Sequence, residues 1–255
     1  MDWNADAGPH KYLLGTEQGV VATLNMRNKK TNGGITLSSE EGNGKHHGAI
    51  YSIQRNPFHP KYFMTIGDWT ARMWTEDLNS PIMTTQYMRS SVTAGCWSPT
   101  RPGVFVVTRK DGVLDVWDYF SKQSSTSFTY KVSDSALSSV SFSGGASSNQ
   151  LVAVGDESGT VSLLELSDSL TVRQSNERQA MAGMFQREML REKNLISMEK
   201  EAKKTRIRSE NRAKQIVEEE TKASSEEQEM LLKIESDFLR LITEDDDGDD
   251  GAESK

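Results

Sequence analysis

A ten-residue pattern that occurs four times constrains the fold of this chain more than any other feature. The four copies are separated by 50, 43 and 47 residues, counted from one final residue to the next. Self-similarity with a period of about 20 to 50 residues is typical of repeat architectures. The copies read GTEQGVVATL, TIGDWTARMW, TRKDGVLDVW and GDESGTVSLL, and they end at Leu24, Trp74, Trp117 and Leu164.

Each copy predicts a β-hairpin. An apolar run comes first, small or polar residues follow, and the chain then alternates toward a bulky apolar end. Asp111–Gly112 and Ser158–Gly159 supply the positive φ angles that tight turns need. The four apolar runs are Tyr12–Leu14, Tyr62–Met64, Val104–Val107 and Leu151–Val154.

Additional short strands complete the repeating unit. Alternating segments that break at Pro or Gly precede three of the hairpins, over Ala49–Pro57, Thr93–Pro99 and Leu137–Gly144. Fourth strands are expected at Thr85–Met88 and Ser127–Val132. About four strands in a unit of about 45 residues is the pattern of a β-propeller blade, so the predicted fold class is an all-β propeller.

A change in composition near residue 167 indicates a boundary. All five Trp and all six Tyr precede residue 131. Residues 1–166 carry 14 basic and 15 acidic side chains, whereas residues 167–255 carry 16 and 22, so nearly all of the net charge of −7 belongs to the second part. We predict propeller blades over 1–166, a helical extension with a charged central link over 167–243, and a disordered acidic tail over 244–255.

The second part reads as helical. Apolar residues recur at three- and four-residue steps from Asn176 to Ser197, which predicts one apolar stripe that needs a covering surface. That surface is either the last blade of the same chain or another subunit, and the sequence favours neither. Residues 199–222 contain 14 charged side chains out of 24, which indicates a solvated helix or a flexible link rather than a core.

A compact apolar stripe returns in MLLKIESDFLRLI, beyond the charged link. Such a stripe on a helix is typical of a segment that docks into a partner. The candidate partner-binding residues are Met230, Leu231, Ile234, Phe238, Leu241 and Ile242.

Motifs for catalysis, metal binding and cofactor binding are not evident. GNGKHHG lacks the first glycine of a phosphate-binding loop, because Ser39 stands there, and His46 replaces the final hydroxyl residue. The only cysteine is Cys96, which we expect to be a small core residue. The nearly neutral blades argue against nucleic acid, and no apolar run is long enough to span a membrane. We therefore expect a protein that is not an enzyme.

The second and third units resemble WD40 repeats. Trp74 and Trp117 stand at the signature tryptophan, and Asp68 and Asp111 at the turn position, where the resemblance implies a carboxylate that fixes the hairpin. His47, just ahead of GAIYSI, resembles the Gly-His position of these repeats. The first and fourth units depart from the pattern, with Gln18 and Ser158 at the turn position and Leu24 and Leu164 at the tryptophan position.

Three separated segments resemble the axonemal dynein intermediate chains, most nearly the second type of the outer arm. The segments are RNPFHPKYFMTIGDWTARMWTEDLNSPIM, WSPTRPGVFVVTRKDGVLDVWD and MFQREMLREK. The resemblance implies a non-catalytic scaffold in the axoneme of a cilium or flagellum, and in the cytoplasm during assembly. Its implied partners are dynein heavy chains, a second intermediate chain, light chains and, indirectly, doublet microtubules.

Alternatives remain at this point. A general WD-repeat scaffold, or a cytoplasmic dynein intermediate chain, would carry the same blades. Trp3 leaves almost no room for an opening strand, so we expect a partial first unit and three complete ones. A WD-type propeller is expected to need more blades, which predicts the C-terminal half of a larger propeller, completed by upstream residues or by another chain.

Overall fold

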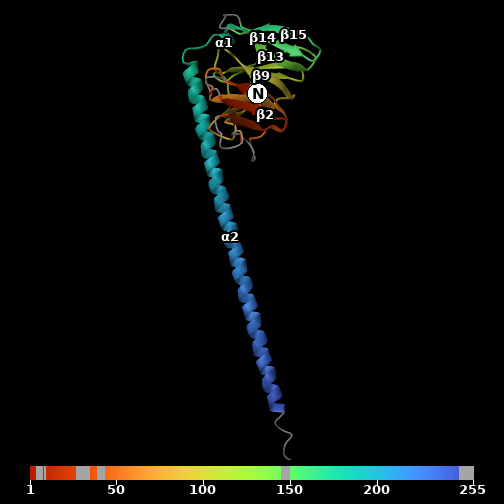
Figure 1. The fold of residues 1–255 in the computed structure, drawn as a ribbon, viewed down its shortest axis with the longest axis vertical. Coiled ribbons are helices and arrows are strands. Elements are labelled where there is room, and N and C mark those ends of the chain that lie inside the picture. The colour runs from red at the N-terminus through yellow and green to blue at the C-terminus, as the bar shows by residue number, and fades with distance from the viewer. Residues whose placement is uncertain (4–7, 9, 27–34, 39–43, 145–149, 247–255) are drawn as a thin grey trace, which may run out of the picture. The chain divides into compact units, whose positions relative to one another are not determined.

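Four antiparallel sheets follow one another along the chain in the computed structural model, which describes residues 1–3, 8, 10–26, 35–38, 44–144 and 150–246 (Figure 1). The first sheet has the order β1 (Asp2–Trp3), β2 (Lys11–Gly15), β3 (Val21–Asn25) and β4 (Ile35–Ser38). The second contains β5 (Ile50–Arg55), β6 (Tyr62–Gly67), β7 (Thr70–Thr75) and β8 (Met83–Thr84). The third contains β9 (Val92–Trp97), β10 (Val104–Arg109), β11 (Val113–Asp118) and β12 (Phe128–Lys131). The fourth contains β13 (Leu137–Phe142), β14 (Leu151–Asp156) and β15 (Val161–Glu165).

The four predicted hairpins are present as β2–β3, β6–β7, β10–β11 and β14–β15. In the second hairpin, Phe63 pairs with Trp74 and Gly67 with Thr70, so that only Asp68 and Trp69 connect the strands. The third hairpin has a longer turn, because Thr108 pairs with Leu114. Both terminal tryptophans are buried, although the two turns differ in length.

The numbers of strands in the first and fourth sheets differ from those predicted from the sequence. The first sheet has an opening strand, β1, because Asp2 and Trp3 pair with Leu13 and Tyr12. The fourth sheet has three strands among the described residues. The chain enters α1 (Asp168–Thr171) directly after β15. The partial unit is therefore the fourth and not the first.

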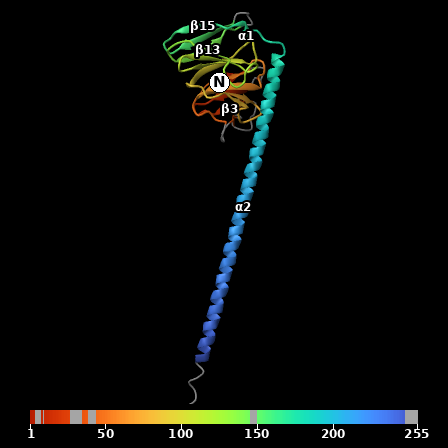
Figure 2. The same ribbon diagram turned by 180° about the vertical axis from the view of Figure 1, so that it is seen from behind.

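Neighbouring sheets bury apolar side chains against each other in chain order. Leu13 and Val21 of the first sheet pack with Phe63 and Trp74 of the second. A larger cluster joins the second and third sheets, and another joins the third and fourth, where Leu170 of α1 also packs. Figure 2, seen from behind, shows α1 at the same end of the sheets as β13 and β15.

The apolar residues at the start of the helix α2 (Glu177–Asp246) are covered by the sheets of the same chain. Met181, Met184 and Phe185 are 1%, 2% and 0% exposed and belong to the core between the second and third sheets. The ring of Phe185 stacks on Tyr62 with a centroid distance of 4.7 Å. The first part of the predicted stripe thus packs on the second and third blades of the same chain and not on the last blade, whereas Leu195 is 51% exposed.

The chain forms two compact units, Met1–Asn194 and Leu195–Lys255. The first unit therefore includes the opening turns of α2 and extends beyond residue 166. Residues 199–222 continue α2 as helix, which decides between the helix and the link that the charge pattern left open. No described helix is both long enough and apolar enough to cross a bilayer. Most of the predicted acidic tail, residues 247–255, lies outside the described residues.

Candidate functional site

The turn of the second hairpin is fixed by the carboxylate of Asp68. Its backbone has a φ of 51°, in the left-handed region that side chains other than glycine rarely occupy. The Oδ1 atom accepts hydrogen bonds from the backbone N–H of Trp69 at 2.6 Å and of Thr70 at 2.8 Å, and from the Thr70 hydroxyl at 2.8 Å. These charge-assisted bonds compensate for the strained backbone and hold the two-residue turn.

A chain of buried hydrogen bonds connects this turn to Trp74. The indole Nε1 of Trp74 donates to Thr65 Oγ1 at 2.8 Å, and Thr65 Oγ1 lies 2.8 Å from His46 Nε2. His46 Nδ1 lies 3.1 Å from Asp68 Oδ2. The four side chains are almost completely buried. Only a neutral imidazole with its proton on Nδ1 satisfies every group, because Thr65 then donates to Nε2 and Nδ1 donates to the carboxylate.

The histidine of this network is His46, so the prediction of a side-chain role for His47 was wrong. The side chain of His47 is exposed, and its backbone N–H donates to Asp68 Oδ2 at 3.0 Å. Gly67 makes room for the His46 ring, because a Cβ atom at Gly67 would lie 3.2 Å from His46 Nδ1 and 2.7 Å from the Ala49 carbonyl. The adjacent histidines are indistinguishable by sequence spacing alone, which explains the error by one residue.

Electrostatics favour a charged Asp68 beside a neutral His46. Burial alone would raise the pKa of Asp68, but hydrogen bonds from His46, Thr70 and the His47 N–H together hold it well below its usual range. Arg72 Nη2 adds an ion pair with Asp68 Oδ2 at 3.3 Å. Burial lowers the pKa of His46, although its bond to Asp68 acts in the opposite direction.

The third hairpin uses a different arrangement. No bond from a turn N–H to the carboxylate of Asp111 is found in the described part of the chain, and its Oδ1 instead pairs with Arg109 Nε at 3.2 Å. Gly112, with a φ of 79°, supplies the turn conformation here. The predicted hairpin-fixing role of Asp111 is therefore not observed. Trp117 is 2% exposed and stacks on Phe105 at 5.9 Å.

The turn of the fourth hairpin is bound by the carboxylate of Asp156, which comparison of the four repeated segments did not single out. Asp156 Oδ1 accepts from the Ser158 hydroxyl at 2.7 Å and from the Thr160 N–H at 2.9 Å. Asp156 Oδ2 accepts from the Ser133 hydroxyl at 2.8 Å. Ser158 occupies the aligned position, but it is a donor to the carboxylate two residues earlier. The signal for this arrangement is the D-x-S-G-T spacing, which offers an aspartate two residues before a serine.

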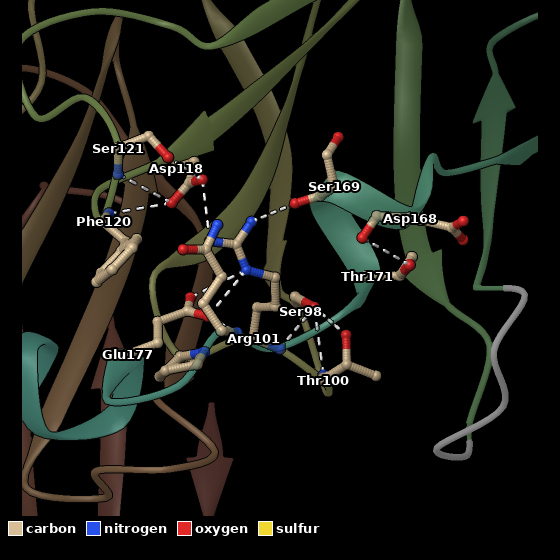
Figure 3. Close-up of polar contacts among 12 residues, drawn as sticks. Ser98, Thr100, Arg101, Asp118, Phe120, Ser121, Asp168, Ser169, Thr171 and Glu177 are labelled. Atoms are coloured by element: carbon tan, nitrogen blue, oxygen red, sulfur yellow. Dashed lines mark hydrogen bonds and ion pairs between the residues drawn. The ribbon is translucent and has the colours of Figure 1, made fainter.

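A buried arginine joins the sheets to the start of α2 (Figure 3). Arg101 is fully buried, and its Nη2 pairs with Asp118 Oδ2 at 3.1 Å. Its Nε lies 3.0 Å from Glu177 Oε1, and its Nη1 donates to the Ser169 carbonyl at 2.6 Å. Glu177, the first residue of α2, is itself 0% exposed. The guanidinium thus connects the third blade to α1 and α2. The sequence did not predict this contact, because its residues are far apart along the chain.

Several residues of the candidate partner-binding stripe are exposed. Met230, Leu231, Ile234 and Phe238 have exposed fractions of 68%, 62%, 59% and 62%. The backbone of Leu241 and Ile242 is helical, and their side chains lie outside the described part. Such exposure of large apolar side chains on one helix segment is typical of an interaction surface.

A catalytic or metal-binding constellation is not found in the described residues. No group of three or more His, Cys, Asp or Glu side chains within these ranges is arranged to hold a metal ion. Burial raises the pKa of the Cys96 thiol to about 12, which keeps it protonated and unreactive at neutral pH. The buried charges form structural ion pairs and hairpin networks.

These sheets and their hairpin network define the blades of a WD40-type β-propeller. A chain in the crystal structure of the mitotic checkpoint complex has the same fold over 66% of this chain and 47% of its own length, with a TM-score of 0.52 and 16% identity. The sheets form a partial propeller.

The family model for the WD40 domain of dynein axonemal intermediate chain 3 matches residues 4–166, and the chain belongs to this family of axonemal dynein intermediate chains. Dynein axonemal intermediate chain 2 of Xenopus laevis is 43% identical over 238 residues, which cover 92% of this chain and 38% of the relative. The human protein of the same name is 40% identical over 92% of this chain and 38% of its own length. The 70 kDa intermediate chain of the flagellar outer arm of Chlamydomonas reinhardtii is 39% identical over 94% of this chain and 40% of its own. The chain thus spans about two fifths of the length of these relatives.

Proposed function

We propose that this protein is a non-catalytic intermediate-chain subunit of an axonemal outer-arm dynein. The observation that carries the proposal is the identity of 39–43% with axonemal and flagellar outer-arm intermediate chains, over more than nine tenths of this chain. In this role the blades bind the tail of a dynein heavy chain, next to a second intermediate chain and light chains. The assembled arm attaches to doublet microtubules of a cilium or flagellum after assembly in the cytoplasm.

Fractionation of ciliated cells tests this assignment. A tagged full chain, expressed in cells whose own intermediate chain has been deleted, is expected to appear in the salt extract of axonemes and to sediment with outer-arm heavy chains. Cross-sections of these axonemes should regain outer arms. A chain that stays in the cytosol apart from any heavy chain would support a general WD-repeat scaffold. Sedimentation with the cytoplasmic dynein heavy chain would support the other alternative.

We assign a second contact of the same subunit to the stripe of Met230, Leu231, Ile234, Phe238, Leu241 and Ile242. An amphipathic helix binds by placing such an apolar face into a groove of its partner. Ile234→Asp together with Phe238→Ser should release the chain from the arm without changing the melting of the blades. Ile207→Asp, at an exposed isoleucine of the same helix, is the matched control and should leave co-sedimentation unchanged. Equal release by both variants would contradict a specific docking face.

The non-catalytic assignment predicts that the pure chain does not hydrolyse ATP. The glycine-rich segment before Lys45 lacks the residues of a phosphate-binding loop. Phosphate release by the purified chain should equal the buffer background at every ATP concentration. Turnover that co-elutes with the chain and is abolished by Lys45→Ala would overturn the assignment.

A further inference from the structure

The part of α2 beyond residue 195 carries two segments of opposite charge. Residues 199–214 contain seven basic and three acidic side chains, whereas residues 226–240 contain five acidic and two basic ones. The charged side chains of both segments are exposed. Two exposed segments of opposite sign attract each other, so each of them is an electrostatic complement of the other.

Each segment also presents a row of residues at steps of four, which places them on one face of the helix. In the basic segment these residues are small, and we call Thr205, Ser209 and Ala213 the small row. In the acidic segment they are large, and the large row consists of Met230, Ile234 and Phe238, which are 68%, 59% and 62% exposed. Small residues let two helix axes approach closely, and large side chains from the facing helix fill the space between them.

The two rows do not meet within one molecule. The chain continues as helix between the segments, because α2 runs from Glu177 to Asp246 (Figure 1). At about 1.5 Å per residue, Ala213 and Met230 are about 25 Å apart along the helix axis. The cover for the large row must therefore come from another molecule.

A second copy of the chain provides this cover when its helix runs in the opposite direction. A two-fold axis between two antiparallel helices places the acidic segment of each copy against the basic segment of the other, so both rows of both copies are used in a closed dimer. A parallel arrangement that joins the same rows leaves one segment of each copy without a partner. It also brings Arg208 close to Lys233, so that like charges face each other.

The charges beside the rows agree with the antiparallel arrangement. Arg206 and Arg208 flank the small row on its two sides, and Glu235 and Asp237 flank the large row in the same way. In the antiparallel pair Arg206 lies near Glu235, and Arg208 lies near Asp237. Within the described part of the chain, Arg208, Glu235 and Asp237 have no ion pair, and Arg206 has only an exposed pair with Glu210 on its own helix. Such an exposed pair is weak, so Arg206 can exchange its partner.

We infer that two copies of this chain pair antiparallel along α2, with the small row of each copy packed against the large row of the other. The inference goes beyond the proposed function, because it concerns two free copies and holds whether or not the chain joins a dynein arm. Self-pairing and docking into an arm use the same large row, so they exclude each other.

A charge exchange tests the pairing. One variant of the full chain carries Arg206→Glu and Arg208→Glu, and the other carries Glu235→Lys and Asp237→Lys. Each variant alone places like charges along both sides of the rows and should self-associate at least tenfold more weakly than the unmodified chain. An equimolar mixture restores opposite charges between the two copies and should regain the original affinity. Fluorescence-detected sedimentation velocity of a labelled copy, titrated with an unlabelled second copy, measures these affinities.

The matched control is Lys200→Glu together with Lys214→Glu, which makes the same change of charge on the opposite face of the helix. Its self-association should equal that of the unmodified chain. Association through the sheets is common to all of these chains, so only differences between variants report on α2. A loss as large in the control as in the arginine variant, equal association of all variants, or a mixture that stays as weak as its components would overturn the inference.

Discussion

At the scale of single residues, the second blade depends on one uncharged histidine. His46 connects Thr65 to Asp68, and each of its ring nitrogens has one partner. Protonation would make both nitrogens donors, so that Thr65 Oγ1 would have to accept from His46 as well as from Trp74. Protonation of His46 would therefore leave the Thr65 hydroxyl proton without an acceptor in this network and place a second cation near Arg72.

Stability should decrease as the pH falls below the ordinary pKa of histidine. The pKa of His46 is lowered in the folded protein, so the unfolded chain binds a proton first, below about pH 6.5. The stabilisation is complete above that pH and is lost as the pH falls toward the folded pKa, by at most about 1.4 kcal/mol per pH unit for one histidine. Urea unfolding between pH 8 and pH 5 measures this slope.

The pKa of His59 is also lowered by burial, so the control must separate the two histidines. His59→Gln should retain the part of the slope that His46 causes, whereas His46→Gln should flatten it. A pH slope unchanged in His46→Gln would show that the ring does not titrate as the network requires.

The two turn aspartates should differ in their contribution to stability. Asp68→Ala leaves the buried Arg72, the His46 ring and two turn N–H groups without their acceptor, and we expect a loss of about 3–5 kcal/mol. Asp111, whose side chain is 38% exposed, pairs only with Arg109 Nε among the described contacts, so Asp111→Ala should cost about 0–1 kcal/mol. Denaturant midpoints provide the comparison, and equal losses in the two variants would refute the assignment.

At the scale of elements, the start of α2 is held by charge as well as by apolar packing. Arg101 and Glu177 are both fully buried, and the carboxylate of Glu177 also accepts from the Gln174 N–H at 3.1 Å. Buried ion pairs offset their desolvation only when their hydrogen bonds are complete. Here Glu177 and Ser169 accept from Nε and Nη1 of Arg101, whereas Nη2 has only the ion pair with Asp118 at 3.1 Å and no hydrogen bond.

Glu177→Gln should loosen the opening turns of α2. The loss of a charged hydrogen bond inside the protein costs about 1.5–3 kcal/mol. Hydrogen exchange should become faster over residues 177–190, while the β6–β7 hairpin keeps its protection. Glu188→Gln is the matched control on the same helix, because Glu188 pairs with the exposed Arg191. Similar exchange in the two variants would show that Arg101 does not anchor the helix.

At the scale of the whole molecule, the hydrophobic core of the sheets is incomplete without the side chains at the start of α2. Met181, Met184 and Phe185 fill the core between the second and third sheets, next to Tyr62, Phe105 and Trp117. The fourth sheet also exposes apolar side chains on one face, with Leu151, Val161 and Leu163 at 39%, 66% and 67%. Exposed apolar faces and strand edges promote association.

A fragment of residues 1–166 should therefore aggregate or remain partly unfolded. Extension to residue 194 restores the three core side chains and should raise the soluble fraction and the melting temperature. Additional blades, supplied upstream, should raise both further by covering the apolar face. Sedimentation and calorimetry decide the outcome, and a monomeric, cooperatively melting fragment 1–166 would show that neither α2 nor further blades are required.

The sequence by itself determined the repeat, the four hairpins and the helical extension. Strand alternation and turn residues act between neighbours in the chain, and such local preferences are visible in the residues themselves. The roles of Asp68 and Trp74 came from the resemblance to WD40 repeats, and the structure places both residues on the one hairpin that has a two-residue turn.

Tertiary structure alone decided which groups meet across long separations. His46, and not His47, places its ring beside Asp68, in the space that the missing side chain of Gly67 leaves. Arg101 reaches Glu177 across 76 residues, and Phe185 reaches Tyr62 across the packed sheets, so neither pairing has a local signal. The register of a longer turn left Asp111 without its expected role and Trp117 without the acceptor that Trp74 has. Several partners for these side chains are equally compatible with the sequence. Only the packed structure decides among them, because burying a polar or charged group costs free energy unless its hydrogen bonds and charge are satisfied.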